Sequence, residues 1–378
     1  MTVGEFFSNR LKNILLRFEW IYFMEMNKKA IALLSGGLDS SLAVRMMLDQ
    51  GIEIMAVNFS SPFCNCTPKK AGCKHQARKV AEEFGVPIRV IAKGMDYMKI
   101  VQNPPHGHGR GMNPCVDCRI YMLRKVREMM PIEGASFVIT GEVLGQRPMS
   151  QRRRTLEIIE REGGLEGLIL RPLSAQNLPP TEPELAGVVD REKLLAISGR
   201  SRKPQIMLAE ELGVKDYPCP AGGCLLTDEV VAARLRDLFA HVPDYGMLDL
   251  QYLKIGRHFR LRHDLKFIVG RDQEENESIE ALAPAGSTLF VPENFSGPTA
   301  IAFGIPDPAE ERMIGTIIAG YSREEKAPYL IKKRMRGGGE SVFPVMERMQ
   351  RERMDAYRVG NITTETFPRV EKLHEGAH

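Results

Sequence analysis

The sequence contains no apolar run close to the roughly 18 residues that a membrane-spanning helix requires. A membrane is therefore not expected among its partners. The sequence also lacks GxxxxGK[ST], the loop whose lysine grips the β- and γ-phosphates of a nucleotide, and this argues against γ-phosphoryl transfer. Seven cysteines, an odd number, do not make a disulfide framework. They favour a reducing compartment, so a cytoplasmic location is expected.

Positive charge is in only slight excess, because the net charge of the 378 residues is +4. Basic residues are nevertheless grouped at 152–154, 254–263 and 332–336. Such groups can contact phosphates, although a charge run is more often a solvated face. The apolar share of 43% is ordinary for a globular protein. The length suffices for two or three domains that each bury a core.

Strand and helix patterns alternate over the first half of the chain. The continuous apolar run at 30–34 predicts a buried strand, further strands are predicted at 53–58, 87–91 and 136–140, and helical spacing predicts helices between them. This alternation indicates βαβ units and an α/β fold with an open, parallel, Rossmann-like sheet. After a proline-rich segment at 171–184 the sequence pattern is mostly helical, and short β-like runs begin near residue 247.

Five regions are expected from these changes of pattern. Residues 1–27 form an amino-terminal extension, which is not translated if Met24 or Met26 is the start. Residues 28–178 form the parallel-sheet domain, and 179–246 a helical segment. Residues 247–336 form a smaller α+β domain, followed by a polar tail at 337–378.

The turn after the first predicted strand has the composition of an anion site. The segment reads AIALLSGGLDSS and leads into a helix, whose amino-terminal dipole attracts phosphate. Its glycines allow close approach and φ > 0, and its serines add donors. The residues expected to cradle the phosphates of ATP are Ser35, Gly36, Gly37, Ser40 and Ser41. Asp39 beside a phosphate suggests either Mg²⁺ or a structural hydrogen bond.

Cysteines recur where the helix after the third strand begins. Cys115 and Cys118 form a CxxC motif behind an Asn-Pro turn, and a helix amino terminus favours thiolate. Cys224 follows much later in a glycine turn, with Cys219 as an alternative ligand. Three thiolates match a [4Fe-4S] cluster with one open iron. From spacing alone, a thioredoxin-type redox pair and a structural zinc site stand about equal to it.

A second cysteine group lies in the loop after the second strand. Cys64, Cys66, Cys73 and His75 are spaced as CxCxxxxxxCxH, which is not a common zinc-ribbon form. Its role is left open. His106 and His108 flank glycines, and we expect them to be solvent-exposed loop residues rather than ligands.

The motifs together resemble a known family. The strings SGGLDSS, NPCVDC, TGEVLGQRPMSQ and ILRPLS resemble the PP-loop ATP pyrophosphatase superfamily, in particular the catalytic domain of tRNA 4-thiouridine synthases and, less closely, tRNA 2-thiouridylases. The resemblance covers about residues 28–239. It implies that ATP adenylates a uridine oxygen with release of pyrophosphate, and that sulfur then displaces AMP.

Site residues follow from this resemblance by position. Cys115, Cys118 and Cys224 would hold a [4Fe-4S] cluster; without one, they would act as persulfide carrier and resolving thiol. The PP-loop residues with Asp39 would bind pyrophosphate. The residues expected beside the nucleotide or the target base are Asn58, Gly141, Glu142 and Gln146. Implied cofactors and partners are ATP, Mg²⁺, the cluster, tRNA and a sulfide or persulfide donor.

The carboxy-terminal region resembles the RNA-binding domain of NFACT-type proteins. The match covers about residues 252–333 and is carried by Gly270, Arg271, Asn276, Tyr321 and Ser322. The expected function is therefore that of an ATP-dependent tRNA sulfurtransferase. The alternatives are a PP-loop ligase that adenylates a small metabolite, and a non-catalytic RNA-binding protein with a vestigial nucleotide site.

Overall fold

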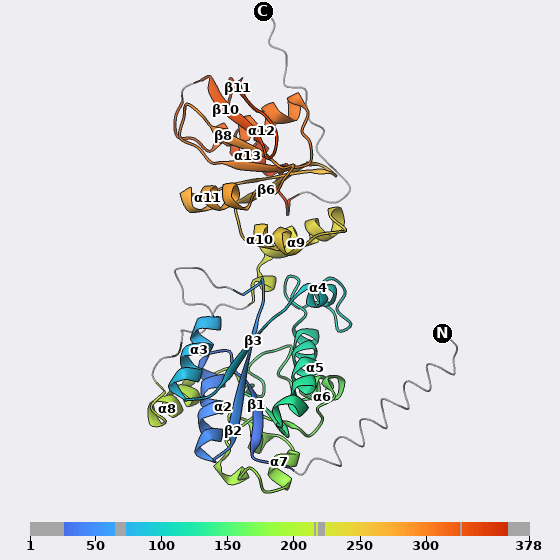
Figure 1. Ribbon diagram of the computed structural model, residues 1–378, viewed down its shortest axis with the longest axis vertical. Coiled ribbons are helices and arrows are strands. Elements are labelled where there is room, and N and C mark those ends of the chain that lie inside the picture. The colour runs from blue at the N-terminus through green and yellow to red at the C-terminus, as the bar shows by residue number, and fades with distance from the viewer. Residues whose placement is uncertain (1–25, 65–72, 215–216, 218–223, 326, 362–378) are drawn as a thin grey trace, which may run out of the picture. The chain divides into compact units, whose positions relative to one another are not determined.

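The computed structural model describes residues 26–64, 73–214, 217, 224–325 and 327–361. The chain divides into two compact units (Figure 1). The amino-terminal domain runs to Gly109 and resumes over Asn113–Leu225. The carboxy-terminal domain consists of Arg110–Met112 and of the chain from Leu226 onward. None of the helices within the described ranges is long and apolar enough to cross a bilayer.

The amino-terminal domain is built on a five-stranded parallel sheet in the order β3-β2-β1-β4-β5. Its strands are β1 (Lys29–Leu33), β2 (Glu53–Ser60), β3 (Ile88–Ala92), β4 (Phe137–Thr140) and β5 (Ile169–Leu170). All five run the same way, so their carboxyl ends share one edge. The predicted open parallel sheet is confirmed.

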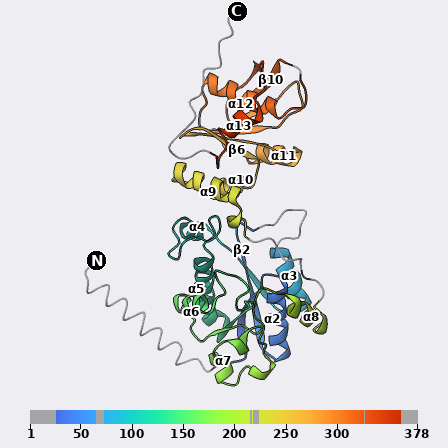
Figure 2. The same cartoon turned by 180° about the vertical axis from the view of Figure 1, so that it is seen from behind.

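Helices cover both faces of this sheet (Figures 1 and 2). One face carries α2 (Leu38–Asp49), α3 (Cys73–Glu83) and α8 (Lys203–Glu211), and the other α5 (Cys115–Glu133) and α6 (Arg153–Gly163). The shorter α4 (Met95–Gln102) follows β3, and α7 (Glu182–Leu185) follows β5. Ala30 and Ala32 are two positions apart in β1 and pack against α2 and α3. The residues that alternate with them are also buried, as expected for a strand covered on both faces.

The carboxy-terminal domain has a six-stranded antiparallel sheet in the order β11-β10-β8-β9-β7-β6. Its strands are β6 (Arg257–Arg262), β7 (Leu265–Val269), β8 (Thr288–Pro292), β9 (Ala300–Phe303), β10 (Tyr329–Met335) and β11 (Glu340–Val345). Helices α12 (Pro308–Gly320) and α13 (Arg351–Asp355) cover the face that carries Phe259, Phe267 and Phe290. Helices α10 (Met247–Tyr252) and α11 (Gln273–Leu282) cover the face with Ile268 and Leu289.

Two expected regions differ from the structure. Helix α8 packs in the amino-terminal core, whereas α9 (Glu229–His241) belongs to the carboxy-terminal domain, so the helical segment at 179–246 is divided. Arg234 of α9 donates hydrogen bonds to the carbonyls of Leu253 and Gly256, both at 2.7 Å. These bonds tie α9 to the start of β6.

The region expected as a polar tail from residue 337 instead begins with structure. Strand β11 pairs with β10, and Val345, Met349, Met354 and Tyr357 are buried in the domain core. Strand β11 is mostly exposed, with Val345 its one buried residue, and the short helix α13 follows it. Residues 1–25, Cys66 and Cys219 lie outside the described residues.

Candidate functional site

The serine hydroxyl groups of the PP-loop form hydrogen bonds within the loop. Ser40 Oγ donates to the carbonyl of Gly37 at 2.9 Å and lies 3.0 Å from Ser35 Oγ, while Ser41 Oγ donates to the same carbonyl at 3.1 Å. Helix α2 begins at Leu38 with no side chain capping its first turn. Its first backbone N–H groups therefore remain available to an anion.

Two glycines are required by close backbone approach. Gly36 has φ +76°, and a Cβ there would lie 2.5 Å from the nitrogen of Ala77 in α3. A Cβ at Gly141, in the turn after β4, would lie 2.5 Å from the Asp39 carbonyl and from the nitrogen of Ser40. Gly37 has φ −86°, so the left-handed conformation expected at both loop glycines occurs only at Gly36.

Asp39 faces cationic and amide groups that the sequence motif did not indicate. Burial raises the pKa of its carboxyl group, and Arg202, Gln146, Arg147 and Gln205 act in the opposite direction without overcoming it. Arg202 Nη2 lies 3.8 Å from Asp39 Oδ2. Asp39 Oδ1 is buried and has no hydrogen-bond partner among the described residues, so it is free to bind a cation.

Asn58 and Glu142 lie at the same carboxyl edge of the sheet and take different contacts. The Asn58 side chain is 2% exposed, and its Nδ2 donates to the carbonyl of Leu34 at 2.8 Å. Glu142 accepts from Arg171 Nε at 3.1 Å and lies 3.3 Å from Arg119 Nε. Burial opposes ionisation of Glu142, but Arg119 and Arg171 prevail and lower its pKa. Glu142 thereby links the turn after β4 to α5.

Cys118 contacts a buried lysine. Lys93, which directly follows β3, donates from Nζ to Cys118 Sγ at 2.9 Å. The same Nζ lies 4.7 Å from the centre of the Tyr97 ring. Burial raises the pKa of the Cys118 thiol, but Lys93, Tyr97 and Arg119 outweigh it and leave the pKa below its ordinary value. The structure therefore favours a thiolate at this position.

Cys115, Cys118 and Cys224 act on one side chain. The pKa of the Tyr97 phenol is raised by burial and by the thiols of Cys118, Cys224 and Cys115. Cys115 and Cys118 of the CxxC motif and the distant Cys224 are thus near enough to Tyr97 to affect its ionisation. The nitrogen of Leu225 also donates to the carbonyl of Phe63 at 3.0 Å, which brings Cys64 and Cys224 into neighbouring segments. All four of these cysteines are free of disulfides.

The chemistry of the thiols bears on whether they could hold a metal group. Within the described ranges, no three His, Cys, Asp or Glu side chains lie close enough to share one metal ion. A [4Fe-4S] cluster binds each thiolate at a different iron, so its ligands are spread more widely. The lowered pKa of Cys118 gives it the thiolate character of a cluster ligand, so its chemistry is compatible with such a cluster.

The two loop histidines contact the protein. His106 Nδ1 lies 2.8 Å from Asp117 Oδ1, and its Nε2 lies 3.2 Å from Glu162 Oε1. The hydrogen bond to Asp117 raises the pKa of His106. His108 is exposed, yet its Nε2 lies 2.7 Å from the carbonyl of Val101. His106 is half-buried, so it differs from the expected solvent-exposed residue and anchors the loop to the CxxC helix.

The carboxy-terminal domain carries a cluster of guanidinium groups around Tyr321. The Arg257 guanidinium lies 4.4 Å from the centre of the Tyr321 ring, and Arg358 Nη2 donates to the Tyr321 hydroxyl at 3.1 Å. Burial and the nearby charges of Arg358 and Arg271 lower the pKa of Arg257. Like charges held together beside an aromatic ring form a favourable site for phosphate and base.

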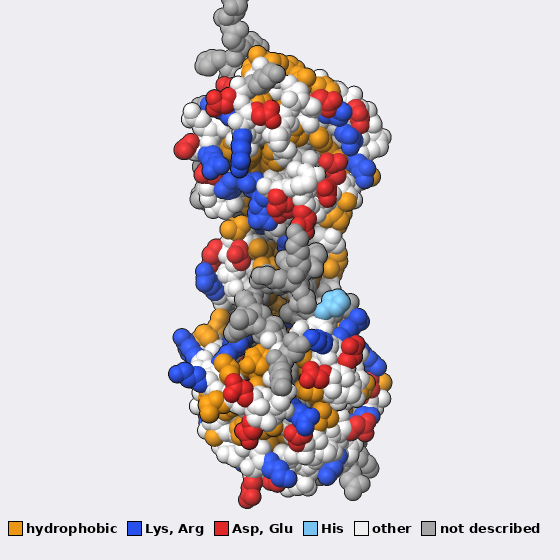
Figure 3. All heavy atoms as spheres, turned by 90° about the vertical axis from the view of Figure 1, so that its left-hand side faces the viewer, with side chains coloured by type: hydrophobic (Ala, Val, Ile, Leu, Met, Phe, Trp, Pro, Cys, Tyr) orange, Lys and Arg blue, Asp and Glu red, His pale blue; other side chains and the backbone are white. Residues whose placement is uncertain are grey.

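The basic run at 332–336 is largely neutralised. Lys332 pairs with Glu293 at 2.9 Å, and Arg334 with Glu340 at 2.7 Å, while Lys333 pairs with Glu311. Figure 3 shows red acidic side chains interspersed with the blue basic ones on the viewed face of this domain. At Tyr321, Arg358 and Arg271 are also paired with carboxylates, whereas Arg257 has no ion pair among the described residues, so Arg257 is the stronger candidate for RNA contact.

Sequence reasoning missed several residues of the site. Lys93 and Tyr97 had a usable signal, because Lys93 directly follows a strand of a parallel sheet, where ligands gather. Arg202 and Gln205 had none, since they lie more than 160 positions after Asp39, at the start of α8. Only the fold brings α8 to the PP-loop.

Comparison with known proteins gives two family matches. Residues 25–177 match the family described as thiamine biosynthesis protein (ThiI). Residues 256–358 match the family described as NFACT protein RNA binding domain.

Curated relatives match part of the chain. A tRNA-specific 2-thiouridylase MnmA 1 of Caldanaerobacter subterraneus subsp. tengcongensis is 30% identical over 149 residues, which is 35% of this chain and 40% of the relative. A probable tRNA sulfurtransferase of Methanosarcina mazei is 32% identical over 126 residues, 31% of this chain and 29% of the relative. The chain thus spans less than half the length of these relatives.

Solved structures are similar at a lower level. A 4-thiouridine synthetase in complex with RNA and ATP has a TM-score of 0.31 at 23% identity, covering 49% of this chain and 51% of that chain. The carboxy-terminal part of a fibronectin/fibrinogen-binding protein from Streptococcus suis has a TM-score of 0.25 at 10% identity. The match covers 65% of this chain and 90% of that chain. On the family matches, the amino-terminal domain belongs to the ThiI family of PP-loop domains, and the carboxy-terminal domain is an NFACT-type RNA-binding domain.

Proposed function

We propose that this chain is a cytoplasmic, ATP-dependent tRNA sulfurtransferase that replaces a uridine carbonyl oxygen with sulfur. The observation that carries the proposal is the 2.9 Å contact between Cys118 and Lys93, which directly follows β3, at the sheet edge that also holds the PP-loop. Strands β3 and β1, which lead to these two groups, are separated only by β2. Two strand spacings are about 10 Å, a distance that one bound nucleotide can bridge.

The PP-loop would bind the phosphates of ATP and activate the uridine oxygen. The open amino terminus of α2 and the loop serines stabilise pyrophosphate, and Asp39 Oδ1 would hold Mg²⁺ between itself and the phosphates. The uridine oxygen attacks the α-phosphorus, and the bond from that phosphorus to the bridging oxygen of pyrophosphate breaks. The oxygen, a poor leaving group in the uridine, becomes part of an adenylate that can depart.

The second step brings sulfur to the activated carbon. Sulfide attacks that carbon, a C–S bond forms, the C–O bond breaks, AMP leaves and a proton is released. On the persulfide route the terminal sulfur of a cysteine persulfide attacks instead, and a second thiol cleaves the S–S bond. This leaves a protein disulfide that an external dithiol must reduce.

The residues of the chain have separate tasks in this scheme. Cys115, Cys118 and Cys224 would hold a [4Fe-4S] cluster, which supplies an iron site at which sulfide can be bound. Lys93 stabilises negative charge on Cys118 sulfur. Arg119 and Glu142 connect the CxxC helix to the turn that packs on the PP-loop, and so fix the distance between sulfur and nucleotide.

The carboxy-terminal domain would bind tRNA outside the reacting base. The guanidinium cluster around Tyr321 supports this role, and an RNA-binding domain argues against a small-metabolite ligase. Two measurements test the proposal. Pyrophosphate release from ATP is expected only when tRNA is added, and mass spectrometry of tRNA nucleosides from a deletion strain is expected to show loss of one thiouridine.

Each outcome separates the alternatives. Pyrophosphate release without RNA, with unchanged tRNA nucleosides, would indicate the metabolite ligase, and absence of any ATP turnover with tRNA would indicate the vestigial site. For the cluster, anaerobically purified protein is expected to show an iron-sulfur absorption band that Cys118→Ala abolishes. A colourless, iron-free wild type would contradict the cluster and favour the persulfide route.

A further inference from the structure

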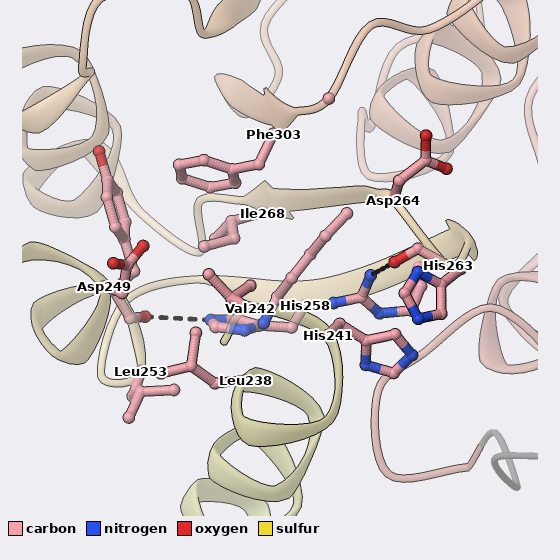
Figure 4. A pocket seen from close by; sticks show the side chains of 14 residues that line it. Leu238, His241, Val242, Asp249, Leu253, His258, His263, Asp264, Ile268 and Phe303 are labelled. Atoms are coloured by element: carbon pink, nitrogen blue, oxygen red, sulfur yellow. Dashed lines mark hydrogen bonds between the residues drawn. The ribbon is translucent and has the colours of Figure 1, made fainter. Parts of the chain in front are cut away.

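The carboxy-terminal domain contains a cavity of about 200 Å³ (Figure 4). It is formed by α9, α10, β6, β7 and β9, so it lies wholly within this domain. Its apolar wall consists of Leu238, Val242, Leu253, Ile268 and Phe303. The volume is below the roughly 300 Å³ of a pocket for a drug-sized ligand. It suits one heterocycle rather than a longer segment.

The charged side chains around the cavity do not favour an anion. Arg260 and Lys266 line it, but Asp237 already holds both, with distances of 2.6 Å from Arg260 Nε and 2.8 Å from Lys266 Nζ. Asp249 and Asp264 add two carboxylates to the lining. An isolated phosphate would therefore meet repulsion as well as attraction. A neutral ligand is favoured.

A buried histidine supplies a hydrogen-bond acceptor. His258 is 2% exposed, and its Nε2 lies 3.0 Å from the carbonyl oxygens of both Tyr252 and Ile255. Carbonyls only accept, so Nε2 carries the proton and Nδ1 is left with a lone pair. Burial, Lys266 and Arg234 hold the pKa of His258 well below its ordinary value, which keeps the ring neutral. Nδ1 has no partner among the described residues.

A buried tyrosine supplies a donor. Tyr252 also lines the cavity, and its hydroxyl is a second buried polar group without a partner in the described part of the chain. Burial and Asp249 raise the pKa of Tyr252 to about 12, so the hydroxyl keeps its proton. A buried donor or acceptor left unpaired costs about 1–3 kcal/mol. A ligand that offered a donor to His258 and an acceptor to Tyr252 would remove that cost.

Two imidazole rings border the cavity. The rings of His241 and His263 lie 4.9 Å apart in an edge arrangement, and Figure 4 shows them next to each other. His263 is exposed, and burial with the nearby Arg260 and His263 lowers the pKa of His241. Imidazole rings are among the platforms on which unpaired RNA bases stack.

We propose that this cavity binds one unpaired nucleobase of an RNA. A base has flat apolar faces and an edge that carries both N–H donors and acceptors, and so matches the lining in shape and in hydrogen bonding. The inference rests on the proposed RNA-binding role of the domain and goes further, since it names the part of the RNA that is held. Base recognition of this kind acts on splayed-out nucleotides of loops and ends.

The test uses the full chain and fluorescence anisotropy. The probes are abasic RNA backbones of equal length, either fully abasic or with a single central A, C, G or U. At least one base is expected to strengthen binding about tenfold, the usual value of stacking one base. His263→Ala is expected to abolish most of this gain, because the residue is exposed and its loss leaves the core intact. Gln273→Ala, exposed on α11 and outside the cavity, should keep the gain.

The outcomes are distinguishable. Equal affinity for all five probes, or a base gain that His263→Ala leaves unchanged, would overturn the cavity as a base site while leaving the RNA-binding role intact. Equal binding would indicate that the domain recognises only backbone phosphates. A wild type that binds neither these probes nor tRNA would overturn the RNA-binding role and the base site together.

Discussion

The contact between Lys93 and Cys118 makes the sulfur chemistry depend on one ammonium group. Lys93→Met removes the charge that offsets burial, so the pKa of the Cys118 thiol should rise. In cluster-free protein, alkylation of Cys118 followed by peptide mass spectrometry should then have its midpoint at higher pH than in the wild type. Lys93→Arg should restore much of the lower midpoint. Lys99→Met, an exposed lysine of α4, is the matched control and should change nothing.

Glu142 forms ion pairs with two arginines, Arg119 and Arg171. Glu142→Gln leaves Arg171, which is 3% exposed, with only Glu160 as its carboxylate partner. Breaking a buried ion pair from one side costs about 3–5 kcal/mol. Urea unfolding at pH 7 should show a loss of this size, whereas Glu157→Gln on the exposed side of α6 should show almost none.

The pH dependence of this loss has a defined sign. The folded state lowers the pKa of Glu142, so the ion pair contributes its full stability above the ordinary value of 4.5. That contribution disappears as the pH falls through the folded-state pKa. The difference between wild type and Glu142→Gln should therefore shrink in acid. A difference that stays constant from pH 7 to pH 3 would show that Glu142 acts through packing alone.

At the scale of elements, the turn after β4 sets the position of the PP-loop. Gly141→Ala would place a methyl group 2.5 Å from the backbone of Asp39 and Ser40. Overpacking of this kind costs about 1–3 kcal/mol, so the domain should still fold with a displaced loop. We expect a large loss of tRNA-dependent pyrophosphate release with a modest fall in melting temperature. Gly94→Ala, which meets only the side chain of Asp96 at 3.4 Å, should retain activity.

The elements also show why part of the site was predictable. The PP-loop and the CxxC motif are each short sequence segments. The residues that carry their chemistry lie within a few positions of one strand end or helix end. Arg202 and Gln205 approach Asp39 only because α8 packs beside α2, which is a tertiary event. The position of α9 and the burial of Met349 and Met354 likewise depend on which sheet is nearby, and no local pattern encodes that.

At the scale of the whole molecule, tRNA binding and chemistry are assigned to different domains, and kinetics can separate them. Arg257→Ala removes a guanidinium that stacks on Tyr321, so the KM for tRNA should rise and the salt dependence of binding should weaken by about one phosphate contact. Its kcat should stay unchanged, because an interaction equal in ground and transition states affects only KM. Lys333→Ala, whose charge Glu311 already neutralises, is the control.

Cys118→Ala should give the opposite pattern, which makes the division of labour testable in one assay. Adenylation needs the PP-loop and not the thiols, so tRNA-dependent pyrophosphate release should persist while thiouridine formation stops. The KM for tRNA should not move, because the guanidinium cluster is intact. If Cys118→Ala instead abolished pyrophosphate release in a well-folded protein, sulfur delivery and adenylation could not be separate steps. The thiols would then belong to the adenylation site itself.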